Sequence, residues 1–274
     1  MKPRPFDYVR PDAIEEAVAL LAEYGDDARV LAGGQSLVPM LNLRLIDAGV
    51  LIDISRIVAL DAIRDRGENI EIGAAVTQNK LMAWPQLAQK LPLVAAALPY
   101  VGHFQTRNKG TVCGSIAHAD PSSELPLALA VLGGEVVLQS QRGSRVLAAN
   151  DFQKDMLTTA REPDELVTAV RFPVTANRGA AFHEVARRHG DFAIVAVAAT
   201  VADGRARLGV GGMAGRPMVR TIAADSAAAI ADAVGQWAEL LEGYEDLHAS
   251  AALRRDLLRN LGPHVVAEAL RCAA

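Results

Sequence analysis

Two short stretches of small residues constrain this chain more than any other feature. The first, Ala32-Gly33-Gly34-Gln35-Ser36, ends an apolar run typical of a strand, and the second is Thr111-Val112-Cys113-Gly114-Ser115. A backbone with few branched side chains can come within hydrogen-bonding distance of a ligand. Consecutive free N–H groups in such turns form a concave anion site. Two such turns on one chain predict one extended ligand that carries a diphosphate, such as a dinucleotide.

The spacing of the glycines excludes the dinucleotide motif of the Rossmann fold. That motif reads GxGxxG, whereas Gly33 and Gly34 are adjacent and no third glycine follows at the required distance. In the second stretch, Cys113 stands where another glycine would allow a closer approach. The two stretches therefore predict a phosphate site of a different architecture.

Composition excludes several other classes of protein. The chain has 274 residues, of which 51% are hydrophobic and 22% charged, and a net charge of −4. These values are typical of a soluble globular protein and give no reason to expect nucleic acid or an anionic membrane as partner. No apolar stretch reaches the roughly 18 residues of a membrane span, and the N-terminus lacks the apolar core of a secretion signal. We therefore expect a cytoplasmic protein.

The chain has too few cysteines to hold a metal cluster by itself. It contains only Cys113 and Cys272, which excludes a disulfide framework and any all-cysteine iron–sulfur or zinc site. Its six histidines show no ligand spacing such as HExxH. We therefore expect no metal on this chain, and any redox carrier here must be organic.

Hydrophobic patterns predict a mixed α and β organisation. The first 55 residues show a β-α-β pattern, the segment 102–110 is a polar and basic loop, and 173–179 is the best linker. The dipeptide Asp203-Gly204 predicts a two-residue hairpin. The remaining elements expected are strands at 70–73, 135–139, 166–172, 194–202 and 205–210, and helices at 93–98, 125–132, 223–241 and 249–272.

Four motifs in order resemble one known family. They are the segments 32–40 and 105–121, with Arg187-Arg188-His189-Gly190-Asp191-Phe192-Ala193 and Asp246-Leu247-His248-Ala249-Ser250-Ala251. Over nearly its whole length the chain resembles the FAD-binding medium subunit of the molybdenum hydroxylases, which include carbon monoxide dehydrogenase, quinoline oxidoreductase and xanthine dehydrogenase.

The resemblance implies an α+β fold of the vanillyl-alcohol-oxidase (PCMH) type. An FAD-binding domain would span residues 1–176, with subdomains of about 1–55 and 56–176 that hold an extended FAD between them. Residues 177–274 would form a small C-terminal domain of the carbon monoxide dehydrogenase flavoprotein type, with a three-stranded sheet and helices.

The resemblance also implies which residues contact FAD. The first stretch would wrap the diphosphate with main-chain N–H groups, and the second would clamp it from the other subdomain. Glu124 would accept hydrogen bonds from a sugar hydroxyl, unless it is simply an acid in the first turn of a helix. Val167 would pack on the isoalloxazine ring, although by sequence alone it is a core strand residue. The implied cofactor-binding set is Ala32, Gly33, Gly34, Gln35, Ser36, Leu37, Thr111, Val112, Cys113, Gly114, Ser115, Glu124, Val167 and His183.

Two positions depart from the family pattern. Cys113 replaces a usual glycine, so its side chain either turns away from the diphosphate or displaces the cofactor slightly; a cysteinyl–flavin bond is the sharper alternative, and a small buried thiol the simpler one. His183 stands where xanthine dehydrogenases place a lysine. It would either donate a hydrogen bond to the flavin ring or be an ordinary surface histidine.

The function implied is electron transfer within a larger enzyme. A small subunit would carry [2Fe–2S] clusters and a large subunit the molybdopterin cofactor, in a dimer of heterotrimers. FAD on this chain would collect electrons from the clusters and pass them to an external acceptor, so we expect no catalytic acid or base here. Two alternatives stay open: a free-standing flavoenzyme of the same fold with its own substrate, and a non-catalytic scaffold that has lost its cofactor site.

Overall fold

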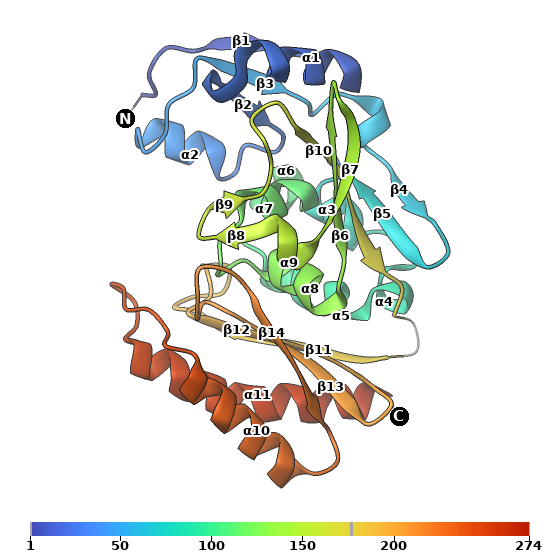
Figure 1. Cartoon of the computed structure of the whole chain (residues 1–274), viewed down its shortest axis with the longest axis vertical. Coiled ribbons are helices and arrows are strands. Elements are labelled where there is room, and N and C mark those ends of the chain that lie inside the picture. Colours follow the sequence, from blue (N-terminus) through green and yellow to red (C-terminus); the bar gives the residue numbers. More distant parts are fainter. Residues whose placement is uncertain (1, 176–177, 274) are drawn as a thin grey trace.

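Three sheets of three to five strands, stacked one above another, organise the chain (Figure 1), and β8 and β9 form a further two-stranded sheet. The computed structural model describes residues 2–175 and 178–273, so the predicted domain boundary at 176/177 lies outside the described residues. The strands are β1 (Asp7–Val9), β2 (Ala28–Leu31), β3 (Val50–Asp53), β4 (Ile63–Asp65), β5 (Asn69–Gly73), β6 (Glu135–Ser140), β7 (Gly143–Ala148), β8 (Gln153–Asp155), β9 (Thr158–Thr159), β10 (Leu166–Pro173), β11 (Gly179–Val185), β12 (Val195–Ala202), β13 (Arg205–Gly211) and β14 (Met218–Ala223). The α-helices are α1 (Ile14–Tyr24), α2 (Leu37–Asn42), α3 (Gln78–Met82), α4 (Leu87–Lys90), α5 (Pro92–Ala97), α6 (Phe104–Lys109), α7 (Val112–His118), α8 (Glu124–Leu132), α9 (Ala149–Phe152), α10 (Ala227–Leu240) and α11 (Ala251–Ala273).

The first sheet has the predicted β-α-β pattern. Its order is β1-β3-β2, and both pairings are parallel. Helix α1 buries Ala17, Val18 and Leu21, which the 3.6-residue period places on one face. Strand β2 then leads directly into the first glycine-bearing stretch. The sheet therefore positions that turn at its edge, above the second layer.

The second sheet is antiparallel, with the order β4-β5-β10-β6-β7. Helix α8 packs beneath it, and all nine residues of this helix are buried. A helix that is apolar on every side belongs in the interior. Its other neighbours are β12 and β13 of the third sheet, where a Cβ on Gly209 would lie 2.2 Å from Val131 Cγ2. Helix α8 is therefore shared between two layers.

The third sheet has four strands rather than the three expected. Its order is β11-β12-β13-β14 and every pairing is antiparallel. The central hairpin turns at Asp203 and Gly204, whose φ angles of +50° and +71° fit a primed two-residue turn, as predicted. Strands β11 and β14 add to its two edges. Helices α10 and α11 cover the outer face (Figure 1).

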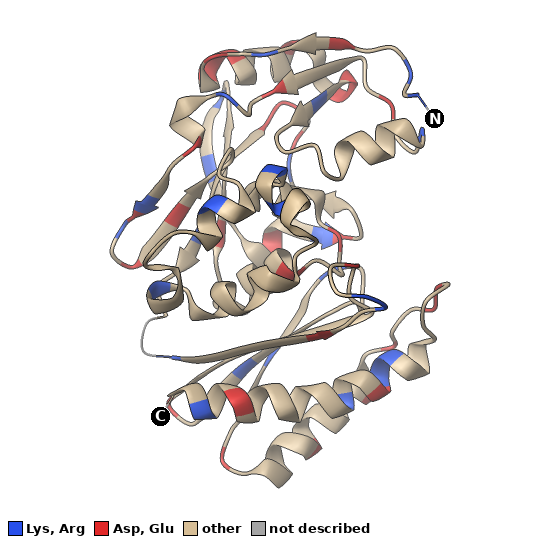
Figure 2. Ribbon diagram, turned by 180° about the vertical axis from the view of Figure 1, so that it is seen from behind, with Lys and Arg blue, Asp and Glu red and all other residues tan. Residues whose placement is uncertain are grey.

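Charges are distributed over the whole molecule. Figure 2 shows positive and negative residues interspersed on the elements of all three layers. Within residues 2–175 and 178–273, no helix is both long enough and apolar enough to cross a membrane.

Arg254 anchors helix α11 to the third sheet. Its side chain is only 1% exposed, and its guanidinium donates to the carbonyl oxygens of Ile194 and Gly212 and to Asp246 Oδ2, the last at 2.6 Å. The guanidinium carbon also lies 4.1 Å from the ring centroid of Tyr244. The motif 246–251 therefore has a structural basis, because Asp246 both caps the following turn and pairs with a buried cation.

Replacing this buried cation will destabilise the chain strongly. We expect Arg254→Met to lower the free energy of unfolding by about 3–5 kcal/mol, because it leaves Asp246 Oδ2 and two carbonyl groups without the guanidinium that donates to them. The matched control is Arg271→Met at an exposed position of the same helix, with an effect of about 0.5 kcal/mol or less. Urea unfolding of both variants measures the difference, and equal losses would contradict the anchoring role.

Candidate functional site

The two glycine-bearing stretches lie side by side, as the hypothesis of a shared ligand requires. A Cβ on Gly33 would lie 2.0 Å from the carbonyl oxygen of Lys109 and 2.7 Å from Cα of Gly110. Only glycine permits this approach of the first layer to the segment that precedes Thr111. Gly34 is required for a second reason, because its φ of +70° is strained for residues with a side chain.

The first stretch offers a row of unused hydrogen-bond donors. Within the part of the chain that the structure describes, the backbone amides of Gly33, Gly34, Gln35 and Ser36 donate to no protein acceptor. Several adjacent N–H groups in a turn can bind an anion together. This observation supports the predicted phosphate-binding role of residues 32–36.

The second stretch differs from the open turn that we predicted. It is the beginning of helix α7, and Thr111 is the N-cap whose Oγ1 accepts from the Gly114 amide at 3.0 Å. The amides of Val112 and Ser115 are also satisfied within the protein, by the carbonyls of Val76 and Thr111. Thr111–Ser115 therefore contributes a wall of small residues and the positive end of a short helix rather than a row of free donors.

A cavity of about 650 Å³ opens beside both stretches. Its wall includes the turn after β2, the start of α7, and the loop 190–192 between β11 and β12, so all three layers contribute. A second hollow of about 690 Å³ shares residues 32–35 and Thr111 with the first. Each volume is in the range of known cofactor sites.

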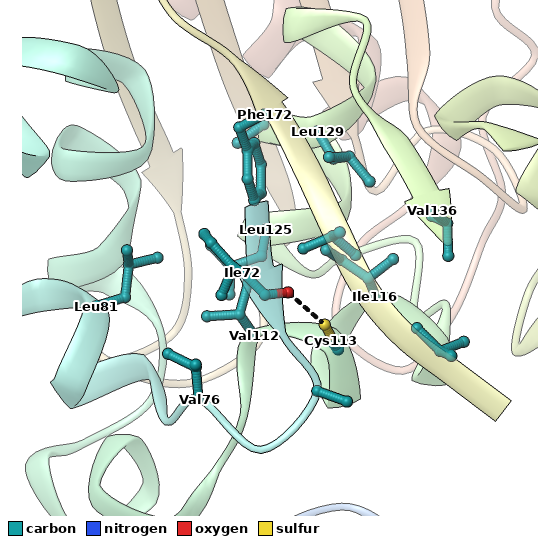
Figure 3. Close-up of a cluster of buried hydrophobic side chains, with 14 of the residues drawn as sticks. Ile72, Val76, Leu81, Val112, Cys113, Ile116, Leu125, Leu129, Val136 and Phe172 are labelled. Atoms are coloured by element: carbon teal, nitrogen blue, oxygen red, sulfur yellow. Dashed lines mark hydrogen bonds between the residues drawn. The ribbon is translucent and has the colours of Figure 1, made fainter. Parts of the chain in front are cut away.

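The structure brings nearly all predicted site residues to this cavity. Those that line it are Ala32, Gly33, Gly34, Gln35, Ser36, Leu37, Thr111, Cys113, Gly114, Ser115, Glu124 and Val167. Val112 does not line it, because its side chain is fully buried in the core beside Ile72 and Ile116 (Figure 3). His183 does not line it either.

Sequence reasoning missed two arginines and one aromatic residue in the cavity wall. Arg29 and Arg161 line it, and burial followed by the charge of Arg29 lowers the pKa of Arg161. Phe192 lines it from the third layer and is 59% exposed. Phe192 lies within the motif 187–193, so a signal existed for it. Arg29 lies in strand β2 and Arg161 in the segment between β9 and β10, and only the fold gathers them.

Cys113 has its side chain in the core, which favours the turned-away alternative. The thiol is 2% exposed and donates to the carbonyl oxygen of Ile72 at 3.4 Å, among apolar side chains (Figure 3). Burial raises the pKa of the Cys113 thiol far above its usual range. A thiol in this position is unreactive, so the structure gives no support to a cysteinyl–flavin bond.

Thiol titration tests this placement. We expect one fast-reacting thiol per native chain with Ellman's reagent, from the exposed Cys272, and two after denaturation. The variant Cys272→Ser should show no fast-reacting thiol until it unfolds. Rapid labelling of native Cys272→Ser would contradict the buried position of Cys113.

Two carboxyl groups have strongly raised pKa values. Glu124 is buried and lines the cavity, whereas Glu184 on β11 is half-buried and does not line it. Burial, with a smaller effect of Asp120, raises the pKa of Glu124 to about 7. Burial and then the charge of Glu124 raise the pKa of Glu184 to about 8. Glu184 Oε2 is buried without a hydrogen-bond partner among the described residues. Near neutral pH Glu184 is therefore mostly protonated, and Glu124 is protonated in about half of the molecules.

This environment predicts a pH-dependent cost to stability. Because the pKa of Glu184 is raised on folding, the folded chain is penalised as pH rises from about 4.5 to about 8. The free energy of unfolding of Glu184→Gln, relative to that of wild type, should therefore be higher at pH 9 than at pH 5 by about 2 kcal/mol. This figure is reduced from the full effect of the pKa shift because the side chain is partly exposed. Urea unfolding at both pH values measures it. Glu23→Gln, at an exposed helix position, is the control, and parallel pH profiles for Glu184→Gln and wild type would refute the assignment.

His183 points away from the cavity because of strand alternation. On β11, Ala180 and Phe182 pack into the core of the second layer, whereas Ala181 packs into the core beneath the outer helices. His183 shares the face of Ala181, and its Nε2 lies 2.6 Å from Glu268 Oε2 on α11. The prediction that His183 contacts the flavin ring is therefore not supported by its position.

Comparisons with known proteins identify the class. Residues 4–175 match the family described as FAD binding domain in molybdopterin dehydrogenase. The 6-hydroxypseudooxynicotine dehydrogenase complex subunit alpha of Paenarthrobacter nicotinovorans is 38% identical over 100% of this chain and 97% of its own length. The carbon monoxide dehydrogenase medium chain of Afipia carboxidovorans is 38% identical over 80% of this chain and 78% of its own.

Solved structures agree with these relatives. Quinoline 2-oxidoreductase from Pseudomonas putida 86 superposes with a TM-score of 0.92 at 33% identity, covering 100% of this chain and 99% of the other. Reconstituted carbon monoxide dehydrogenase from Oligotropha carboxidovorans gives a TM-score of 0.95 at 33% identity, with both chains fully covered. The chain belongs to the FAD-binding medium subunits of the molybdenum hydroxylases. It is an oxidoreductase subunit of the predicted α+β fold, and its cofactor is FAD.

Proposed function

We propose that this chain is the electron-transfer subunit of a molybdenum-containing dehydrogenase or hydroxylase. FAD here accepts electrons from [2Fe–2S] clusters on a small subunit and passes them to an external acceptor. A large molybdopterin subunit oxidises the substrate, and the complex is a dimer of heterotrimers. The observation that carries this proposal is the row of unused amides at residues 33–36, set in a cavity that all three layers share.

The residues of the cavity fit the two parts of FAD. The amides of 33–36 bind the diphosphate, and Arg29 and Arg161 supply positive charge in the same wall. Charge-assisted hydrogen bonds of this kind are among the strongest available to a protein. Glu124, buried at the start of α8, forms a hydrogen bond with a sugar hydroxyl, as acceptor when ionised and as donor or acceptor when protonated.

Apolar side chains also line the cavity. Val167 on β10 and the exposed ring of Phe192 both line it, and these two side chains pack on the flavin ring system. When bound, FAD supplies the ability to take up single electrons and release one or two. The chain itself positions the cofactor and excludes water.

The organic substrate is determined outside this chain. The relatives are named for an oxynicotine derivative, carbon monoxide and quinoline, which share little chemistry. This chain nevertheless covers nearly all of the first and third of these proteins. A subunit that remains the same while substrates differ is expected to serve the step common to all of them, which is electron transfer.

Cofactor and metal analysis of the native complex tests the proposal. We expect a tagged chain, purified from its own host, to contain about one FAD and to bring down molybdenum and iron on separable partner subunits. Gly33→Ala should lower FAD affinity by about 100-fold or more, because its Cβ would meet the Lys109 carbonyl. Molybdenum and iron should stay bound in this variant.

A matched glycine separates cofactor binding from general strain. Gly67 has a φ of +81°, like Gly34, but a Cβ there meets nothing within 4 Å. We expect Gly34→Ala to lose FAD and Gly67→Ala to retain it. An isolated chain that oxidises an organic donor would favour the free-standing flavoenzyme, and a colourless chain that binds no added FAD would favour the scaffold.

A further inference from the structure

Three potential metal ligands meet on the outer side of the third layer. They are His183 on β11 and, one helical turn apart on α11, His264 and Glu268. Their ligand atoms all lie within 4.8 Å of one another. His183 Nε2 is 2.6 Å from Glu268 Oε2, and His264 Nε2 is 3.9 Å from the same oxygen.

The fold holds these side chains in position rather than bringing them together by chance. Residues four apart share one face of a helix, so His264 and Glu268 both face β11. The strand and the helix are in backbone contact nearby, because a Cβ on Gly179 would lie 1.9 Å from the carbonyl oxygen of Ala269. The strand alternation that turns His183 away from the FAD cavity aims it at this helix.

We propose that His183, His264 and Glu268 bind one first-row divalent cation, of which Zn²⁺ is the best match. Imidazole nitrogen and carboxylate oxygen are the ligands that Zn²⁺ prefers, and three protein ligands leave a fourth position for water. The site is separate from the FAD cavity, because none of the three residues lines either hollow.

The three ligand pairs must each reach the separation of a metal site. Bonds of about 2.0–2.1 Å in a tetrahedral arrangement place ligand atoms about 3.3 Å apart. The 2.6 Å contact must therefore open and the 3.9 Å contact must close, each by less than half a bond length of such a site, and the ring nitrogens of His183 and His264, which lie within 4.8 Å, must reach the same separation. The side chains of His183, His264 and Glu268 are 33%, 59% and 35% exposed, so they can move and an ion can enter.

The charge balance of the cluster also favours a cation. Among the described residues, Glu268 forms ion pairs only with these two histidines and with no lysine or arginine. The carboxylate is thus not neutralised by a permanent positive charge. A bound ion would tie the edge strand β11 to α11, which gives it a structural effect that does not depend on electron transfer.

Metal titration of the full FAD-loaded chain, after treatment with a chelator, tests the proposal. We expect one Zn²⁺ per chain by isothermal titration calorimetry and a higher Tm when Zn²⁺ is present. Co²⁺ should give the visible absorption of a low-coordinate site. His264→Ala, which keeps the contact between His183 and Glu268, and Glu268→Gln should each weaken binding by about tenfold or more without loss of FAD.

An exposed histidine elsewhere serves as control. His248→Ala removes an exposed imidazole from another part of the third layer and should leave Zn²⁺ binding unchanged. Absence of binding, or weak binding that His264→Ala leaves unchanged, would overturn the proposal. Because FAD content is measured in the same samples, failure of this site is distinguishable from failure of the FAD site.

Discussion

Close backbone contacts on the segment 102–110 hold the cofactor cavity together. On one side Gly33 fits against Lys109 and Gly110, and on the other a Cβ on Gly190 would lie 2.9 Å from the carbonyl oxygen of Gly102. Arg107 fastens the segment internally by donating to the carbonyls of Val101 and Gly102 at 2.9 Å each. Because glycine has no Cβ, three layers can converge on one short helix and leave space for a ligand beside it.

The electrostatics of the cavity combine two opposing features. Unused amides and two arginines favour an anion at the turn after β2, whereas Glu124 lines the cavity where burial disfavours a charged carboxylate. The raised pKa of Glu124 reduces the negative charge that this side chain brings to the cavity. The chain thus accommodates a strongly anionic cofactor although its own net charge is −4.

Local patterns predicted the parts of the fold that depend on local chemistry. The β-α-β unit, the Asp203-Gly204 turn and the glycine turn at residues 32–36 all follow from residues close together in sequence. Features set by tertiary packing were missed. The segment 102–110 contains helix α6 rather than being a loop throughout, and the amides of Val112, Gly114 and Ser115 are already bonded within the protein. The direction of His183 and the gathering of Arg29 with Arg161 depend on strand alternation and chain reversal, which no local pattern reveals.

Helix α8 has a consequence for how this subunit can be divided. All of its residues are buried, and it lies against both the second sheet and the hairpin β12–β13. Removing the third sheet with helices α10 and α11 would expose the side of α8 that packs on β12 and β13, and this side is apolar. A shortened chain would therefore tend to aggregate, and the small C-terminal layer acts as an obligatory cover for the part that holds the flavin.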